Sequence, residues 1–210
     1  MANSMQHWNG NQVCAIDTET TGLDPLYDEI LQLAIIPLDS NFEVRKDVMP
    51  LEIFMKPEYP ERIKPEAMQV NRLDLDKIMT TGFDKETAIH LLEEWYKKLG
   101  LPCTKYGRPK KVIPLGQNYA FDKGFIQQWL GVDLYNDFFD YHYNDTMITA
   151  NYINNRAAMR GEPVPFSKVN LQYLASTLKI KTDRLHDALQ DAHTCAKVYK
   201  AMMRMGALLI

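Results

Sequence analysis

Cysteine is scarce in this chain, which has three in 210 residues. Cys14, Cys103 and Cys195 are widely separated, and no C-x-x-C pair occurs. Paired spacing is what a disulfide framework or a zinc site requires, so the pattern argues against both. We expect the three residues to be reduced and to serve in packing.

Leader peptides, long apolar runs and low-complexity tracts are also missing. The first residues, M-A-N-S-M-Q-H-W-N-G-N, have neither a basic start nor an apolar core, and no later apolar run approaches the length that spans a bilayer. A content of 46% hydrophobic and 24% charged residues is ordinary for a globular protein. We therefore expect one domain over residues 1–210, with its core at about 12–203, located in the cytoplasm and not in a membrane.

An excess of positive charge is absent too. The formal net charge is −3, which ordinarily disfavours a polyanionic partner. Removing the charges of four carboxylates that bound metal would change −3 to +1. Net charge therefore does not decide whether nucleic acid is a partner.

The stretch V-C-A-I-D-T-E-T-T-G-L-D at residues 13–24 combines a buried strand with clustered acids. Strand side chains alternate between faces, so Asp17 and Glu19 should point the same way. Adjacent carboxylates repel each other, and a hard divalent cation with oxygen ligands relieves that repulsion. Taken alone, a D-x-E sequence is more often a solvated strand end before a turn than a metal site.

Two further strands are predicted at residues 29–38 and 48–56, with Pro37 and Pro50 at strand ends or bulges. The short polar turns between these runs favour an antiparallel meander. Pro65 then marks the start of a short helix. A longer helix is predicted from the cap residue Asp84 to Gly100, followed by a polar, basic loop at residues 103–111.

A strand at residues 112–116 is predicted to deliver N-Y-A-F-D to the start of a helix that ends near residue 130. Phe121, Phe125 and Trp129 recur every four residues and should face the core. Asp122 lies in the first turn, where the helix dipole favours a carboxylate. By itself this position indicates a helix-end charge more readily than a metal ligand.

Three helices should follow, from Asp145 to about residue 161, from the cap residue Asn170, and through H-D-A-L-Q-D at residues 186–191. On one helix, His186 and Asp191 would be about 140° apart. They can converge only if His186 precedes the helix and Asp187 caps it. A surface or capping histidine is the alternative, and small residues at 188, 192 and 196 allow close helix packing.

The segments D-T-E-T-T-G-L (17–23), N-Y-A-F-D (118–122) and H-D-A-L-Q-D (186–191) together resemble the three motifs of the DEDDh family. These DnaQ-like 3'-5' exonucleases include the proofreading epsilon subunit of bacterial DNA polymerase III. The resemblance implies an α/β, ribonuclease H-like fold. Its mixed sheet has an antiparallel meander of three strands plus parallel strands, and helices flank it.

The resemblance also implies chemistry for five side chains. Asp17, Glu19, Asp122 and Asp191 would hold two divalent cations, Mg²⁺ or Mn²⁺, which suit oxygen ligands. His186 would be the general base that takes a proton from the attacking water. The expected reaction is hydrolysis of the last phosphodiester bond, which releases nucleoside 5'-monophosphates.

Substrate contacts are implied at five further positions: Thr20, Leu23, Met68, Asn118 and Phe121. Backbone near Thr20 would hold the 3'-hydroxyl, and Leu23 would wedge against the last base. The expected partner is DNA with single-stranded or frayed 3' ends, with RNA as the alternative, and little base specificity is expected. The basic loop offers weaker candidates for backbone contacts, at Lys105, Arg108, Lys110 and Lys111.

Some positions depart from the family pattern. Gln117 stands where many members have histidine, and Asn71-Arg72 where many have histidine-glycine, both expected at the rim of the substrate pocket. Little sequence follows the third motif, so a free-standing enzyme is expected, with a polymerase partner possible but not required. An exoribonuclease and a non-catalytic nucleic-acid-binding module are the alternative functions.

Overall fold

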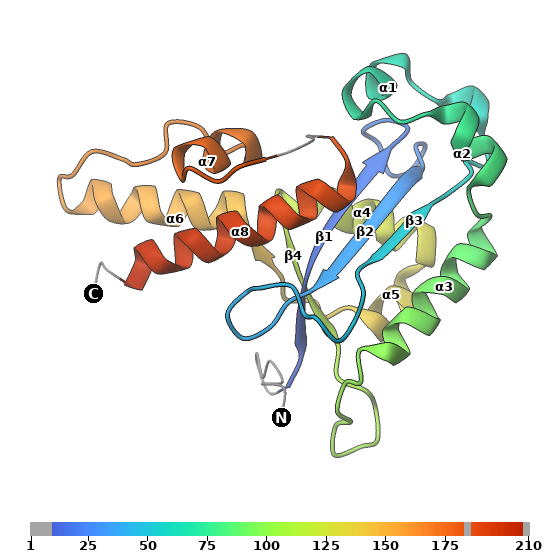
Figure 1. Cartoon of the computed structure of the whole chain (residues 1–210), viewed down its shortest axis with the longest axis horizontal. Helices are drawn as coiled ribbons and strands as arrows, with labels where there is room; N and C mark the ends of the chain where they lie inside the picture. The colour runs from blue at the N-terminus through green and yellow to red at the C-terminus, as the bar shows by residue number, and fades with distance from the viewer. Residues whose placement is uncertain (1–9, 183–185, 208–210) are drawn as a thin grey trace.

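The computed structural model describes residues 10–182 and 186–207, which fold around a five-stranded sheet (Figure 1). The strand order is β3-β2-β1-β4-β5. The strands are β1 (Gln12–Thr20), β2 (Ile30–Pro37), β3 (Leu51–Phe54), β4 (Val112–Gly116) and β5 (Asn144–Asp145). The ribonuclease H-like class predicted from sequence is confirmed by this mixed sheet and its flanking helices.

The predicted antiparallel meander is present. Strand β2 pairs antiparallel with both β1 and β3, and Asp17 lies opposite Ala34 in the register. Pro37 ends β2, and Pro50 precedes β3, as expected for residues that lack an N–H donor. The third strand is shorter than the predicted 48–56 because only four residues keep the ladder.

The other half of the sheet is parallel. Strand β4 pairs with β1 and with β5, so the carboxyl ends of β1 and β4 lie at the same edge. The chain that leaves each strand there enters a loop or a helix. This edge is where polar side chains from distant parts of the sequence can meet.

One face of the sheet is covered by α3 (Lys85–Lys98), α4 (Tyr119–Leu130) and α5 (Val132–Phe138). Its core includes Cys14 and Ile16 from β1. Of the predicted α4 stripe, Phe125 is buried, but Phe121 and Trp129 are only half-buried. The stripe therefore faces the core at its centre, while its two ends remain accessible.

The opposite face carries α6 (Thr146–Met159), α7 (Leu171–Thr177) and α8 (Ala188–Ala207) (Figure 1). Val13 and Ala15 of β1 point into this second core. The small residues Ala188, Ala192 and Ala196 are buried against it, and α8 lies on β1 and β2. Without large side chains in between, the helix approaches the sheet closely.

Three short helices lie beyond the carboxyl edge of β1, namely η1 (Pro60–Arg62), α1 (Pro65–Asn71) and α2 (Leu75–Thr81). Pro65 begins α1 as predicted. The sequence analysis did not identify α2, α5 or β5. Each has seven residues or fewer, so periodicity had too few turns to reveal it.

Predicted capping residues are confirmed. The Asp84 carboxylate accepts the N–H of Thr87, and the Asn170 side chain accepts the N–H of Tyr173. Cys14 and Cys195 are buried packing residues, but Cys103 is exposed, so the packing role predicted for it is wrong. Within the described residues, no helix combines the length and apolar character needed to span a membrane.

Candidate active site

Strand β1 ends with side chains that alternate between the two faces of the sheet. Asp17 and Glu19 follow Val13 and Ala15 on the face that α8 covers, and both keep some contact with solvent. Thr18 points to the α4 face, where its hydroxyl donates to Asp122 Oδ1 at 2.7 Å. The strand thus offers two acids to α8 and a hydrogen bond to the acid of α4.

His186 lies in the loop immediately before α8, as predicted. Its backbone has a left-handed φ of 66°, and its N–H donates to Asp191 Oδ2 at 3.1 Å. Asp187 accepts the N–H of Gln190 at 3.2 Å and caps the helix. This left-handed turn brings the His186 ring back over the first turn of α8, beside Asp191.

Three side chains converge here, from β1, from the loop before α8 and from α8 itself. One ligand atom each from Glu19, His186 and Asp191 lies within 4.8 Å of the others. Asp191 Oδ1 is buried and has no hydrogen-bond partner among the described residues. A buried carboxylate oxygen without a donor needs compensation, which a bound cation supplies.

The acids raise one another's pKa. Burial first, and then the charges of Asp122 and Glu19, hold the pKa of Asp17 well above its ordinary value. Burial and the carboxylates of Asp191 and Asp122 raise the pKa of Glu19 to about 8. Four acids so close are poorly stable as free anions, and a divalent cation favours their ionised forms.

Asp122 stands apart from the group of Glu19, His186 and Asp191 because it reaches the cluster from the other face of the sheet. Burial raises its pKa to about 7, while the hydrogen bond from Thr18 opposes that rise.

The start of α4 is fixed by Asp145, whose Oδ2 accepts the N–H of Tyr119 at 2.7 Å. The Oδ1 of Asp145 caps α6 by accepting the N–H of Met147. One buried carboxylate therefore holds two helices at the carboxyl edge.

The loop 22–28 presents Leu23, whose side chain is 79% exposed. Asp28, buried beneath the loop, accepts the N–H of Asp24 at 2.8 Å and the Lys64 ammonium at 2.7 Å. Burial opposes its ionisation, but these bonds outweigh burial and keep the pKa of Asp28 below its ordinary value. A Cβ on Gly22 would lie 2.2 Å from that carboxylate, so only glycine fits.

Thr20 and Asn71 join this loop to α1. The Thr20 hydroxyl donates to the carbonyl of Gly22, so its backbone rather than its side chain is available to a ligand. The buried Asn71 donates to the Thr20 carbonyl at 3.3 Å. Met68 is half-buried on α1. The helix and the end of β1 are therefore held as one unit.

The remaining predicted substrate residues are on α4 or just before it. Asn118 is exposed with a left-handed φ of 59°, and Phe121 is half-buried against Phe125. Gln117, expected at the pocket rim, instead donates to the Val169 carbonyl and accepts from Thr146. Its amide is engaged in joining α4 to the second core.

A groove of about 850 Å³ runs beside His186. Arg72 and Lys77 contribute positive charge to its wall, and Asn71 and Asp187 also line it.

The basic loop at residues 103–111 lies elsewhere, because it leads into Val112, which pairs with Gln12 at the amino end of β1. That end is about 25 Å of strand from Thr20. Contacts from Lys105, Arg108, Lys110 and Lys111 to phosphates beside the acids are therefore not supported.

Acids gathered at the carboxyl edge of such a sheet indicate a nuclease. A family model described as RNase_T, Exonuclease, matches residues 14–199. The chain therefore belongs to this exonuclease family, the DEDDh exonucleases with a ribonuclease H-like fold.

Particular relatives agree with this family. Ribonuclease T of Wigglesworthia glossinidia brevipalpis is 26% identical over 190 residues, which cover 88% of this chain and 80% of the relative. The fold matches cell-death related nuclease 4 (TM-score 0.71, 16% identity), covering 93% of this chain and 64% of that one. It also matches exonuclease I of Methylocaldum szegediense (TM-score 0.70, 20% identity), covering 95% of this chain and 42% of the other.

Sequence reasoning missed several supporting residues. Thr18 and Asp28 act through hydrogen bonds to partners that are distant in sequence. Thr18 lies between the two motif acids, which is the one local signal that could have identified it. Nothing in the sequence alone pairs Asp28 with Lys64.

Proposed function

We propose that this chain is a 3'-5' exonuclease that removes nucleoside 5'-monophosphates from single-stranded or frayed 3' ends of DNA. The observation that carries the proposal is the convergence of Glu19, His186 and Asp191 within 4.8 Å on the fold of an exonuclease family. The alternative within the family is hydrolysis of RNA, which the similarity to ribonuclease T favours. Exonuclease I, whose fold is similar, has been solved in complex with dT13 and dA16 oligonucleotides.

The donor set fits divalent cations. The unpartnered Asp191 Oδ1 and the raised pKa of Glu19 are both relieved when a cation binds. Asp17, Glu19 and Asp191 would hold one ion, and Asp17 with Asp122 a second, in all-oxygen sites that suit Mg²⁺ or Mn²⁺. When bound, such ions acidify the attacking water and stabilise charge on the leaving oxygen.

His186 is the base in this proposal. Its ring is exposed at the mouth of the cluster, and its backbone is fixed by the bond to Asp191.

The strand end would be held by the residues around the cluster. Exposed Leu23 can separate the last base from the next, and the backbone at Thr20 can accept the 3'-hydroxyl. The groove lined by Arg72 and Lys77 lies on the His186 side and can receive the terminal nucleotide. Apolar contacts of this kind depend little on base identity.

The test is a time course on matched 5'-labelled DNA and RNA oligomers with Mg²⁺, Mn²⁺ or chelator. We expect a metal-dependent ladder that shortens from the 3' end and is absent with Asp17→Ala, because that change removes a carboxylate shared by both ion sites. The ratio of the hydrolysis rates on DNA and on RNA shows which of the two is the preferred substrate. Oligomers that stay intact in every metal would refute the proposed activity.

A further inference from the structure

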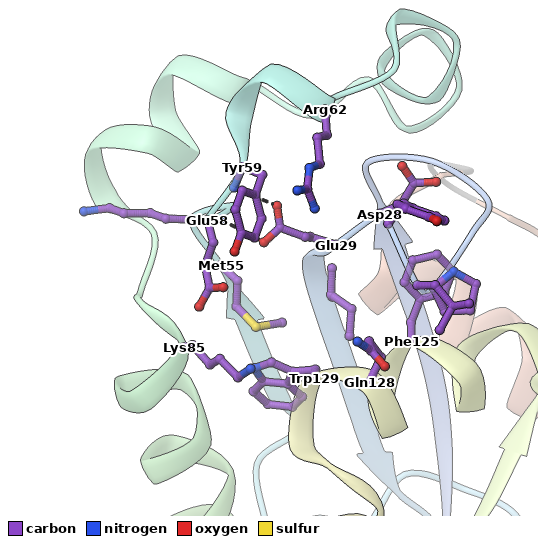
Figure 2. Close-up of a pocket in the computed structure, with 15 residues that line it drawn as sticks. Asp28, Glu29, Met55, Glu58, Tyr59, Arg62, Lys85, Phe125, Gln128 and Trp129 are labelled. Carbon is purple, nitrogen blue, oxygen red and sulfur yellow. Dashed lines mark hydrogen bonds between the residues drawn. The ribbon is translucent and has the colours of Figure 1, made fainter.

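A second pocket, of about 140 Å³, lies behind the loop 22–28 and away from the groove beside His186. Figure 2 shows its labelled side chains around a common hollow, with Arg62 at one end and Lys85 and Trp129 at the other. Its walls come from the loop, from the segment after β3 and from α4. None of the residues assigned above to the reaction, and none of the predicted substrate contacts, lines it.

The pocket combines accessible aromatic rings with a vacant donor. The Tyr59 ring is 43% exposed and lies 3.9 Å from the Arg62 guanidinium, and Tyr27 is 64% exposed. The Trp129 Nε1 is buried and finds no acceptor among the described residues. A planar ligand with hydrogen-bond acceptors at its edge would satisfy both features, and a nucleobase is such a ligand.

The charges around the pocket favour a phosphate-linked ligand. Lys56, Arg62 and Lys85 are the cations that line it. Two of the three acids in the lining are already engaged: Asp28 by Lys64, and Glu29 by the backbone N–H groups of two residues at 2.8 and 3.0 Å. The backbone bonds leave the charge of Glu29 in place. With Asp28 paired to Lys64 outside the lining, the three cations therefore exceed Glu29 and Glu58 by one charge.

The pocket and the acidic cluster share helix α4. Phe125 lines the pocket, and its ring lies 4.9 Å from that of Phe121, the neighbour of Asp122. Four residues of helix separate the two rings, about 6 Å along the axis. The loop that carries exposed Leu23 also carries Leu26 and Tyr27, which form the pocket rim. Ile30 of the pocket wall also pairs with Thr20, next to Glu19, so the pocket lies beside the strand end that carries the acids.

Building on the exonuclease function proposed above, we propose that this pocket binds a base of the substrate strand upstream of the scissile bond. Tyr59 stacks on the base, Trp129 Nε1 donates to its edge, and Arg62 and Lys85 face the adjoining phosphates. The pocket thereby makes affinity depend on strand length, since a dinucleotide is too short to reach it.

The test measures binding of a labelled oligothymidylate of about twelve nucleotides, a length within the range of single-strand sites, with non-hydrolysable phosphorothioate linkages. Tyr59→Ala should weaken binding about tenfold through lost stacking. Trp129→Phe, which keeps a ring but removes the donor, should weaken it about threefold. Hydrolysis of a dinucleotide should stay unchanged in both variants.

Tyr152→Ala is the matched control, because this exposed tyrosine also lies beside an arginine but belongs to α6. Wild-type affinity in Tyr59→Ala, or an equal loss of affinity in Tyr152→Ala, would refute the proposal that this pocket binds the strand. The activity is judged separately: if the wild type cleaves nothing but Tyr59→Ala still weakens binding, the pocket stands and the exonuclease proposal fails.

Discussion

In the proposed mechanism, the residues of the site divide into groups that react and groups that hold them. Glu19, Asp191 and His186 face one another, whereas Thr18 and Asp28 each orient a neighbour through one short hydrogen bond. The two roles predict different effects of substitution. Loss of a reacting group should reduce turnover, and loss of a holding group should reduce stability as well.

His186→Ala tests the first role. We expect turnover to fall about 100-fold or more, the usual scale for loss of a general base, while Mn²⁺ binding measured by calorimetry persists. His90→Ala on α3 is the control, since this histidine is also exposed but distant in the fold. Unchanged turnover in His186→Ala would remove this residue from the mechanism.

Gly22→Ala tests the second role. The new methyl group would meet the Asp28 carboxylate at 2.2 Å, so the loop that carries Leu23 must shift. We expect a loss of about 1–3 kcal/mol in the free energy of unfolding, the range for overpacking. In a double-mutant cycle with Asp28→Ala, the two costs should be less than additive. A melting temperature equal to wild type would contradict the steric argument.

Helix α8 links stability to the site at the scale of secondary structure. Ala188, Ala192 and Ala196 lie against the sheet, and Asp191 on the same helix meets Glu19 of β1. Any displacement of the helix therefore moves an acid relative to its partners. Packing and the placement of Asp191 cannot be varied independently along this element.

Ala192→Leu should reveal that link. The side chain is fully buried, and the added volume should destabilise the fold by about 1–3 kcal/mol while lowering turnover. Lys197→Leu, at an exposed position of the same helix, is the control and should leave both unchanged. Thermal melts and the oligomer assay measure the two effects. A stable but fully active Ala192→Leu protein would mean that α8 does not set the position of Asp191.

At the scale of the whole molecule, the acid cluster should make metal-free stability depend on pH. Unfolded Glu19 loses its proton near the ordinary value of 4.5, whereas the folded pKa is about 8, and Asp122 shifts in the same direction. Between these values the folded state binds more protons than the unfolded state. Stability contributed by these groups is therefore present at low pH and is lost as pH rises.

The melting temperature in chelator should accordingly fall between pH 4.5 and about 8. Mg²⁺ binds the ionised acids, so it should restore most stability at the upper end of that range. The Glu19→Gln variant has no titratable group at this position, so its melting temperature should fall less steeply with pH. A wild-type curve no steeper than that of Glu19→Gln would show that the cluster does not carry the effect.

Sequence by itself determined the elements with strong local signals. The buried run before Asp17, the cap residues Asp84 and Asn170 and the proline at the start of α1 act on their own neighbours, so their patterns were sufficient. The placement of His186 before α8 also followed from helix geometry, because five residues on one helix cannot bring it to Asp191. The three motifs indicated the family for the same reason: each is contiguous.

Only the tertiary structure decided how these segments meet. The position of Asp122 on the α4 face, the bonds from Thr18 and Lys64, the inward amide of Gln117 and the pocket at Trp129 all join residues far apart in the chain. It also placed the basic loop at the far end of β1 and left Cys103 exposed. Such contacts depend on sheet order and on which face each helix covers, and local sequence preferences do not encode either.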